Sequence, residues 1–571
     1  MNRKIVICSD GTGNRGGLGK DTNVWRIYNA AAGREAQNQF AIYDDGVGTE
    51  RILLKRAVGA MFGLGLSNNI RELYQSLCQV YEPGADIYLF GFSRGAHTIR
   101  TLAGFITSQG ILNPTNYDND ELFAKDIFIL YDAYRFLDYR KPELCRRRWF
   151  EKNSDISKAS DNSSNSDRLA SVRENLFQSN SSNHWNRYHT STQQQLNIPR
   201  DEEYRDLLLP ENRRVPIRFI GVWDTVDAVG FPMEWIADYW NAYAYRYQFR
   251  DYKLSPFVSH ACHALAIDDA RQTFKPRLFD VRDETNGEAQ DRIKQIWFAG
   301  VHSNIGGGYP KQGLAHISLC WIAQEAKRHG MIIDGNPTKT VGEGSVPLLV
   351  QEEEKLYHAQ SNPHDRLYNS RSGLSEFYRY HPRDVTTLNK ALSDQEPIVD
   401  ASVIARVARR TGQYSPWNLP ESFRIVDSCD SNPLKFFSDA GSENRIAAKW
   451  SNIFEKKQAL NNVKRRVGDP GKNEFECLDA FVEIPKQTRS LSRYQSGLKI
   501  AAVFVLIGFL TLLAQGILDQ APLFSIMVFV LAVIAFIHHS IDISYSEKIK
   551  RNATLIWANC ISEARISRTH D

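Results

Sequence analysis

Paired cysteines are missing from this sequence. Its eight cysteines are dispersed, none forms a C-x-x-C pair, and Cys8 directly follows the apolar run Ile5–Ile7. Disulfide scaffolds and zinc sites depend on closely spaced ligands, whereas scattered thiols are typical of proteins that fold in a reducing compartment. We therefore expect reduced cysteines, a cytosolic main body, and neither a metal nor a cofactor.

A strong net charge and a secretory signal are missing as well. The chain has 70 Lys and Arg against 66 Asp and Glu, a net charge of +4. This charge is too small for general electrostatic binding to phosphate backbones, so no nucleic-acid partner is expected. The apolar run before Asp10 is too short to be the apolar core of a cleaved signal peptide, so we do not expect export of the main body. A chain of 571 residues with 42% hydrophobic and 24% charged residues is globular and too long for one domain.

Long apolar runs are confined to the C-terminal region. Residues 500–518 and 521–537 carry no charged side chain, and each would extend roughly 25 to 29 Å as a helix, close to the ~30 Å hydrocarbon core of a bilayer. Lys and Arg flank the pair on both sides, and Asp519 is the only charged residue between the runs. We predict a two-helix transmembrane hairpin with a C-terminal tail in residues 496–571, with the catalytic body and the C-terminus cytoplasmic. A buried helical hairpin of a soluble domain is the alternative.

The rest of the chain alternates short apolar runs with helical patterns. Apolar residues at helical spacing predict a helix over Ser67–Tyr81. Strands followed by helices indicate an α/β fold with a mostly parallel sheet, which we expect to occupy residues 1–334. The segments that have the length and apolar content of buried strands are Lys4–Ser9, Phe40–Tyr43, Asp86–Phe90, Ile217–Trp223 and Ile293–Val301.

Two regions do not follow this alternation. Residues 118–213 interrupt it, and their Ser-, Asn- and Gln-rich part, 154–195, is typical of a flexible loop, so we expect an inserted cap here. Residues 335–495 have a mixed, mainly helical pattern with few chemical signals. They are predicted to form an ancillary region.

The strand predicted at Asp86–Phe90 runs into a G-x-S-x-G motif, Gly91–Gly95, and a helical pattern follows. In such a nucleophile elbow the serine hydroxyl stands exposed on a strained turn, and the two glycines let neighbouring backbone pass. We predict that Ser93 is a nucleophile and that the Arg94 amide, at the start of the helix, donates to the oxyanion. A structural turn serine is the alternative.

A serine nucleophile needs a base and a carboxylate that orients the base. Asp224 and His302 each follow a predicted strand, so we expect both to meet Ser93 at the C-terminal edge of a parallel sheet. Their order along the chain, Ser, Asp, His, is that of α/β hydrolases. Asp227 is an alternative carboxylate that lies farther from its strand. The competing histidines, which fall within or beside helical patterns, are His97, His260, His263 and His316.

The loop after the first predicted strand contains Asp10, Gly11 and Thr12. Residues Gly11–Gly16 formally match G-x-G-x-x-G, but the next helical pattern begins only near Thr22, which disfavours a dinucleotide site. We expect the Gly11 and Thr12 amides to supply a second oxyanion donor. Asp10 is expected to cap or brace the loop.

Six short motifs follow one another in the first part of the chain. They are Cys8–Asn14, Tyr43–Thr49, Gly91–Ala96, Val222–Val226, His263–Asp269 and Trp297–Tyr309. This set resembles the α/β-hydrolase catalytic domain of type VI secretion phospholipase effectors and their uncharacterised bacterial and fungal relatives. The resemblance covers about residues 1–330.

The resemblance implies a Ser-Asp-His hydrolase of phospholipid acyl esters with Ser93, Asp224 and His302 in the matching positions. Two residues depart from the family pattern: Asn304 stands where many relatives have Asp, and His316 where an acidic residue is frequent. If an acidic residue at 304 orients the base in some members, Asp224 is the sole carboxylate here.

These observations predict a membrane-anchored serine esterase, phospholipase A-like, with membrane lipids as both substrate and anchor. The order of the three candidate residues favours an enzyme, and the apolar runs favour a lipid substrate. Two other functions stay open: a thioesterase or carboxylesterase acting on soluble acyl esters, and a non-enzymatic membrane-anchored binding or pore module.

Overall fold

The computed structural model describes the following residues: 2–11, 14, 21–45, 66–136, 215–227, 252–282, 292–333, 361–372, 375, 378–393, 395–428, 446–452, 480, 483–498, 501–502, 505 and 521–561. The predicted flexible loop at 154–195 and almost all of the first apolar run at 500–518 lie outside these residues.

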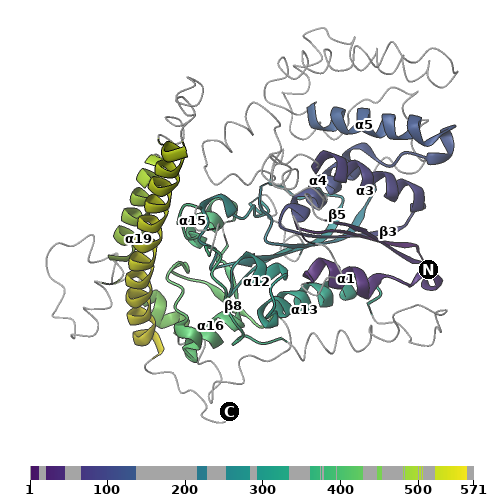
Figure 1. The fold of residues 1–571 in the computed structure, drawn as a ribbon. Coiled ribbons are helices and arrows are strands. Elements are labelled where there is room, and N and C mark those ends of the chain that lie inside the picture. The colour runs from purple at the N-terminus through teal and green to yellow at the C-terminus, as the bar shows by residue number, and fades with distance from the viewer. Residues whose placement is uncertain are drawn as a thin grey trace, which may run out of the picture.

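One sheet of eight strands organises the described residues, and every neighbouring pair of strands is parallel (Figure 1). The spatial order is β2-β1-β3-β4-β5-β6-β7-β8. The predicted α/β class with a mostly parallel sheet is confirmed, and all five predicted strands are present. The strands are β1 (Lys4–Ser9), β2 (Gln39–Asp44), β3 (Asp86–Phe92), β4 (Ile217–Trp223), β5 (Val258–Ala266), β6 (Ile293–Phe298), β7 (Ile398–Asp400) and β8 (Arg424–Val426).

Strand β5 was not predicted from the sequence. We expected His260 and His263 within or beside helical patterns, and this was wrong, because both lie on β5 between β4 and β6. Central parallel strands are covered on both faces and are usually near-continuous apolar runs. Here histidines interrupt the run, and the structure accommodates them: the His263 Nε2 accepts from the Thr225 amide at 3.2 Å, and the His260 ring stacks on His329.

Helices cover both faces of the sheet (Figure 1). The helix predicted over Ser67–Tyr81 is present as α3, displaced by one residue. Short 3-10 turns occur at Glu35–Gln37, Pro114–Asn116, Gln272–Phe274 and Thr411–Gln413. Helices α3 (Leu66–Val80), α4 (Arg94–Gln109) and α5 (Asp120–Phe136) lie on one face, and α1 (Asn23–Ala31) and α13 (Gly313–Arg328) lie on the other.

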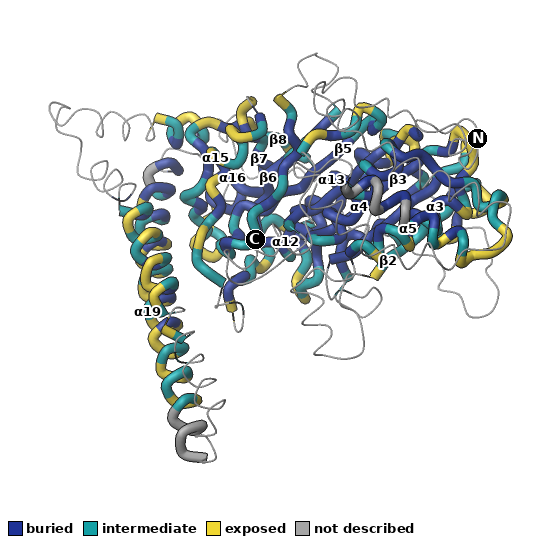
Figure 2. The backbone as a smooth tube through the Cα atoms, turned by 90° about the horizontal axis from the view of Figure 1, so that it is seen from above, coloured by how far each residue is buried: buried dark blue, intermediate teal, exposed yellow. Residues whose placement is uncertain are grey.

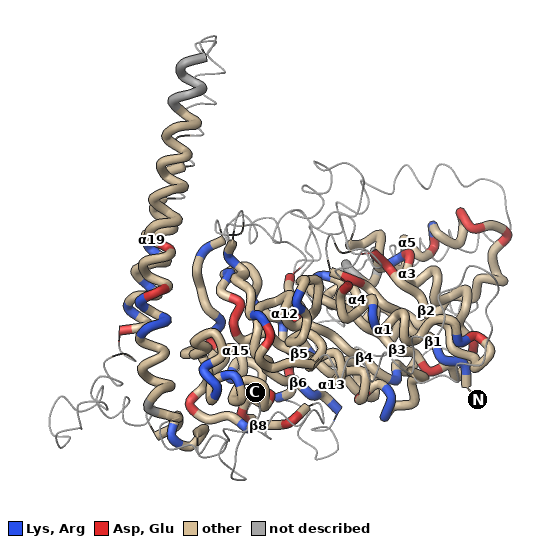
Figure 3. The backbone as a smooth tube through the Cα atoms, turned by 60° about the horizontal axis from the view of Figure 1, so that its bottom comes forward, with Lys and Arg blue, Asp and Glu red and all other residues tan. Residues whose placement is uncertain are grey.

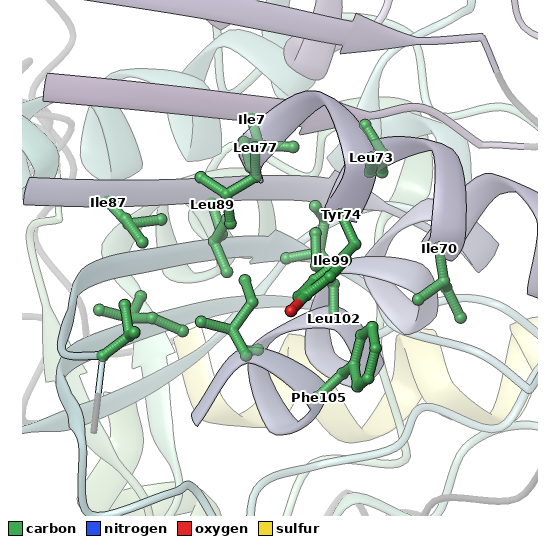
Figure 4. Close-up of a cluster of buried hydrophobic side chains, with 14 of the residues drawn as sticks. Ile7, Ile70, Leu73, Tyr74, Leu77, Ile87, Leu89, Ile99, Leu102 and Phe105 are labelled. Atoms are coloured by element: carbon green, nitrogen blue, oxygen red, sulfur yellow. The ribbon is translucent and has the colours of Figure 1, made fainter. Parts of the chain in front are cut away.

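The apolar face of α3 shows how these layers hold together. Leu73, Tyr74 and Leu77 belong to the same buried cluster as Ile87 and Leu89 of β3, and all five are almost completely buried (Figure 4). Burying a side chain of this size stabilises a fold by roughly 1.5 to 3 kcal/mol. Helical spacing on α3 and alternation on β3 therefore produce one continuous core.

Helix α5 begins the segment predicted to be an inserted cap. Its Tyr131 and Tyr134 rings pack on Phe105 of α4, with ring centroids 5.4 Å and 5.5 Å apart. This first part of the segment thus joins the helical layer over the sheet. Residues 137–213 lie outside the described residues, so the cap itself stays a prediction.

The sheet continues past the domain boundary predicted at residue 334. Strand β7 pairs with β6, and β8 pairs with β7, so the described part of the predicted ancillary region extends the same sheet. Helices α15 (Val385–Lys390) and α16 (Ala401–Ala408) accompany these strands. Strands of three residues are too short to produce a recognisable alternation, which is why the sequence indicated only a mixed pattern.

A single helix, α19 (Ala521–Ile561), occupies the position of the second predicted membrane helix and continues well past its predicted end at 537. Its 41 residues extend about 60 Å at 1.5 Å per residue. In the described part of the chain it is the one helix long and apolar enough to cross a membrane, over Met527–Ala558. The predicted two-helix hairpin is therefore not supported.

The two halves of α19 differ in composition and surroundings. The N-terminal half projects away from the body and has no Lys, Arg, Asp or Glu up to Ile541 (Figures 2 and 3). The C-terminal half packs on the body, where Ile549, Ala553 and Trp557 are buried and the Trp557 ring stacks on Trp450 at 4.3 Å. The second half was predicted to be a tail because its charged residues hid this amphipathic packing.

Candidate active site

Ser93 lies on the sharp turn between β3 and α4. Its φ of 58° and ψ of −121° are strained for a residue with a side chain. The flanking glycines are required by close backbone packing, because a Cβ on Gly91 would lie 2.6 Å from the Gly95 carbonyl oxygen, and one on Gly95 would meet the backbone of Ser9. The G-x-S-x-G motif therefore forms a sharp turn from strand to helix, with Ser93 between the two.

His302 and Asp224 reach Ser93 from two other strands. Asp224 directly follows β4, and His302 is the first residue of α12 (His302–Gly306), just after β6. The His302 Nε2 lies 2.7 Å from the Ser93 Oγ, and the His302 Nδ1 lies 2.6 Å from the Asp224 Oδ2. The three residues predicted from the sequence thus form one hydrogen-bonded row at the carboxyl edge of the sheet.

The imidazole of His302 is enclosed, with only 5% of the residue exposed. The rings of Phe92 and Phe274 flank it at 4.7 Å and 5.3 Å between centroids. Burial lowers the pKa of His302 below its usual range, and the Asp224 carboxylate opposes this effect in part. A neutral ring that donates Nδ1–H to Asp224 leaves Nε2 free to accept the Ser93 proton.

Asp224 is fully buried and adopts a left-handed φ of 42°. Its Oδ1 accepts from the Ala266 amide at 3.0 Å. Arg383 binds both carboxylate oxygens, with Nη1 2.6 Å from Oδ1 and Nη2 2.8 Å from Oδ2. Burial alone would raise the pKa of Asp224, but the Arg383 charge and the hydrogen bonds from His302 and Arg383 hold it far below the usual range.

Arg383 is the residue at this site that the sequence analysis missed. It lies in the region after 334, outside the six motifs and just before α15. A lone arginine in a segment without periodicity carries no local sign of its partner. It reaches Asp224 because the segment before it pairs antiparallel with residues that follow β5, through the bridge between Arg271 and Tyr380.

Of the three predicted oxyanion donors, Arg94 has a suitable place, because it is the first residue of α4, at the positive end of the helix dipole. The Gly11 amide donates to the Asp10 Oδ1 at 2.6 Å, so the expectation that it points at an oxyanion is not met. Thr12 lies outside the described residues.

Asp10 braces the loop after β1, as predicted. Its Oδ2 accepts from the Thr22 hydroxyl at 2.5 Å and from the Tyr43 hydroxyl at 2.9 Å. Burial raises the pKa of Asp10 to about 6, against these hydrogen bonds and that from Gly11. The loop is thereby tied to β2 and to the start of α1.

Asn304 does not take the place of a carboxylate beside the base. Its Nδ2 donates to the Arg366 carbonyl at 3.1 Å, and its Oδ1 accepts from the Tyr368 amide at 3.2 Å. The side chain therefore fastens the 366–368 segment to α12. Asp224 is the carboxylate that meets the His302 ring.

The alternative candidates have other partners. Asp227 forms an ion pair with Arg277, whose Nε lies 2.6 Å from its Oδ1. His97 and His316 are buried on α4 and α13, in agreement with their helical patterns. Among the described residues, His302 is the histidine that contacts the Ser93 hydroxyl.

Comparisons with known proteins relate this chain to one family and to two individual proteins. Residues 3–325 match the family described as T6SS, phospholipase effector Tle1-like, catalytic domain. An uncharacterized protein of Saccharomyces cerevisiae is 34% identical over 124 residues, which cover 19% of this chain and 18% of that protein. The chain thus matches less than a fifth of this relative's length.

Among solved structures, the crystal structure of an uncharacterized protein from Pseudomonas aeruginosa aligns with 85% of this chain and 62% of its own, at 16% identity and a TM-score of 0.30. The family match, by contrast, takes in more than half of the chain. The chain therefore belongs to the family of Tle1-like phospholipase effectors, and residues 3–325 correspond to the catalytic domain of that family.

Proposed function

We propose that this protein is a membrane-anchored serine hydrolase that cleaves carboxylic ester bonds of phospholipids, in the manner of a phospholipase A. The observation that carries the proposal is the hydrogen-bonded row from the Ser93 Oγ through His302 to Asp224, at 2.7 Å and 2.6 Å. Membership in a phospholipase effector family supports a lipid substrate.

In the proposed reaction the Ser93 oxygen attacks the ester carbonyl while His302 Nε2 takes its proton. Asp224 accepts the Nδ1–H bond throughout and stabilises the imidazolium that forms. The imidazolium then returns the proton to the departing alcohol, which leaves an acyl group on Ser93. Water, deprotonated by His302, hydrolyses this acyl-enzyme, releases a fatty acid and restores the serine.

The developing oxyanion needs donors that are already in place. We assign the Arg94 amide as the first donor, because Arg94 is the first residue of α4 and the positive end of the dipole of that helix lies at the turn of Ser93. The Gly11 amide is occupied by Asp10, so the second donor is assigned to Thr12.

The projecting half of α19 supports attachment to a membrane. Residues 521–541 have no charged side chain and extend about 30 Å, the thickness of a hydrocarbon core. Phe529 and Phe536 are 68% and 71% exposed, and such apolar exposure is unfavourable in water. We propose that this half lies in a bilayer and keeps the attached body at the surface of its substrate.

Fatty-acid release from phosphatidylcholine vesicles tests the proposal. We expect release by the wild type and by Ser108→Ala, a control serine on α4 that donates to the Phe105 carbonyl and accepts from the Gln109 side chain, and none by Ser93→Ala. Equal release by wild type and Ser93→Ala would refute the serine mechanism. Turnover of short soluble esters without release from vesicles would instead favour an esterase or thioesterase of soluble substrates.

A further inference from the structure

Both oxygens of the Asp224 carboxylate are held by a fixed set of donors. Oδ1 meets the Ala266 amide and the Arg383 Nη1, and Oδ2 meets the His302 Nδ1 and the Arg383 Nη2. The guanidinium thus grips the carboxylate as a fork, a geometry that fixes its plane as well as its position. One of the two fork contacts falls on the same oxygen that receives the His302 bond.

Arg383 is itself rigidly held. Its side chain is 1% exposed, and its Nη1 and Nη2 also donate to the carbonyls of Ala266 at 2.5 Å and Phe274 at 2.7 Å. The Asn418 amide group bonds the Arg383 carbonyl at 2.9 Å and ties the backbone at this point to Ile267. The fork therefore cannot leave Asp224 without breaking several buried hydrogen bonds.

We propose that Arg383 is a positioning residue of the reaction, which keeps Asp224 ionised and oriented so that His302 presents Nε2 to the serine. The proposal rests on the proposed function, because it needs Asp224 and His302 to act as a pair. Arg383 touches neither Ser93 nor the reacting atoms and acts only through Asp224.

Electrostatics give the reason for such a residue. A carboxylate without exposure to water favours its protonated form, and a protonated Asp224 no longer accepts the Nδ1–H bond as an anion does. The Arg383 charge prevents this protonation. The same positive charge also makes a second proton on the Asp224 and His302 pair less favourable, so its removal shifts protonation of the pair to higher pH.

Other titratable groups lie around the pair. Burial raises the pKa of Asp268 to about 6, and its Oδ2 accepts from the Gly300 amide at 2.6 Å and from the Tyr414 hydroxyl at 3.0 Å. Asp269 accepts from the His302 amide at 3.2 Å and forms an ion pair with Arg271 at 2.7 Å. His263 lies beneath Asp224 on β5, and burial lowers its pKa to about 3, so it stays neutral in the working range. Arg383 is therefore the cation that balances Asp224.

Arg383 lies outside the part of the chain that matches the family. The family match ends at residue 325, whereas Arg383 belongs to the segment between β6 and β7. The region after the matched domain thus contributes the residue that positions Asp224.

The full-length variants Arg383→Met and Arg383→Lys test the proposal. The rate at which a fluorophosphonate labels Ser93 is measured from about pH 5 to pH 9, because it reports activation of the serine without a known substrate. We expect Arg383→Met to be labelled on the order of 10²-fold more slowly, with the acid limb of the profile displaced to higher pH. Arg383→Lys keeps the charge and should restore the acid limb and part of the rate.

Turnover of a short ester supplies a second readout. Since Arg383 does not touch substrate, kcat should fall in Arg383→Met while KM stays near that of the wild type. In an Asp224→Asn background, Arg383→Met should lower kcat little further, because the carboxylate that Arg383 positions is already absent. Additive losses in this double variant would overturn the proposal.

Arg406→Met is the matched control, since Arg406 is equally buried, donates to the carbonyls of Pro363 and Asp365, and lies over the Tyr414 ring. An equal shift of the acid limb in this control would show that any buried arginine matters, and would overturn the proposal. The proposal would also be overturned if Arg383→Met lowered the labelling rate by the same factor at every pH and Arg383→Lys restored none of that rate. If Ser93→Ala were labelled like the wild type, the proposed function itself would fail.

Discussion

Asp224→Asn is the substitution whose outcome the site geometry determines most sharply. The four donors around the carboxylate leave no acceptor for an amide NH2 group. If the NH2 replaces Oδ1, it faces two donors that cannot change, the Ala266 amide and the Arg383 Nη1. If it replaces Oδ2, it faces the Arg383 Nη2 and the His302 Nδ1, and the imidazole can change tautomer.

The second orientation therefore has the lower free energy, and it places the His302 proton on Nε2. In that tautomer the ring cannot accept the Ser93 proton at 2.7 Å. The corresponding substitution in serine proteases lowers kcat about 10⁴-fold for the same reason, and we expect a loss of this order. Arg383 would also lose its anionic partner, which we expect to lower the free energy of unfolding by about 3 kcal/mol.

Fluorophosphonate labelling and a thermal melt, measured on the same preparation, separate these two effects. Asp227→Asn is the control, because Asp227 pairs with Arg277 away from the imidazole. We expect its labelling rate to match the wild type. Labelling of Asp224→Asn within tenfold of the wild-type rate, or an equal loss in Asp227→Asn, would refute the reasoning.

Three further outcomes are expected. In Gly91→Ala the new Cβ would lie 2.6 Å from the Gly95 carbonyl oxygen, so the soluble yield and Tm should fall; a wild-type melting curve would contradict the packing. Because burial lowers the pKa of His302, which must be neutral to act, ester hydrolysis should persist below the ordinary value of about 6.5 and be lost only at lower pH; an acid limb above 6.5 would speak against this. Arg371→Met leaves Asp542 of α19 buried without its 2.6 Å ion-pair partner and should lower the free energy of unfolding in detergent by about 3 kcal/mol, whereas Arg371→Met combined with Asp542→Leu should recover most of it; equal losses in both would count against docking of α19 through this pair.

The parts of the fold that follow from local pattern were predictable. β1 and β4 are short segments made mostly of apolar residues, and their predicted bounds are those of the structure. Ser93, Asp224 and His302 each follow a predicted strand, and parallel strands bring their carboxyl ends to one edge. This topology is why the meeting of the three side chains could be predicted, while their catalytic role stays a prediction.

The parts that depend on distant contacts were not predictable. Strand β5 carries His260 and His263, whose polarity is compensated by partners elsewhere in the chain. Arg383 meets Asp224 only because the segment before α15 folds back on the end of β5. The full length of α19 was not predicted, because its last turns are buried against Trp450, which lies in another segment of the chain.

The identity of the labelled residue tests the central claim most directly. Full-length protein is treated with a fluorophosphonate, digested, and its peptides are weighed by mass spectrometry. We expect a single phosphonyl adduct on Ser93 in folded wild-type protein and no adduct in Ser93→Ala. An unlabelled Ser93 in folded wild-type protein, or an adduct that persists in Ser93→Ala, would contradict this claim.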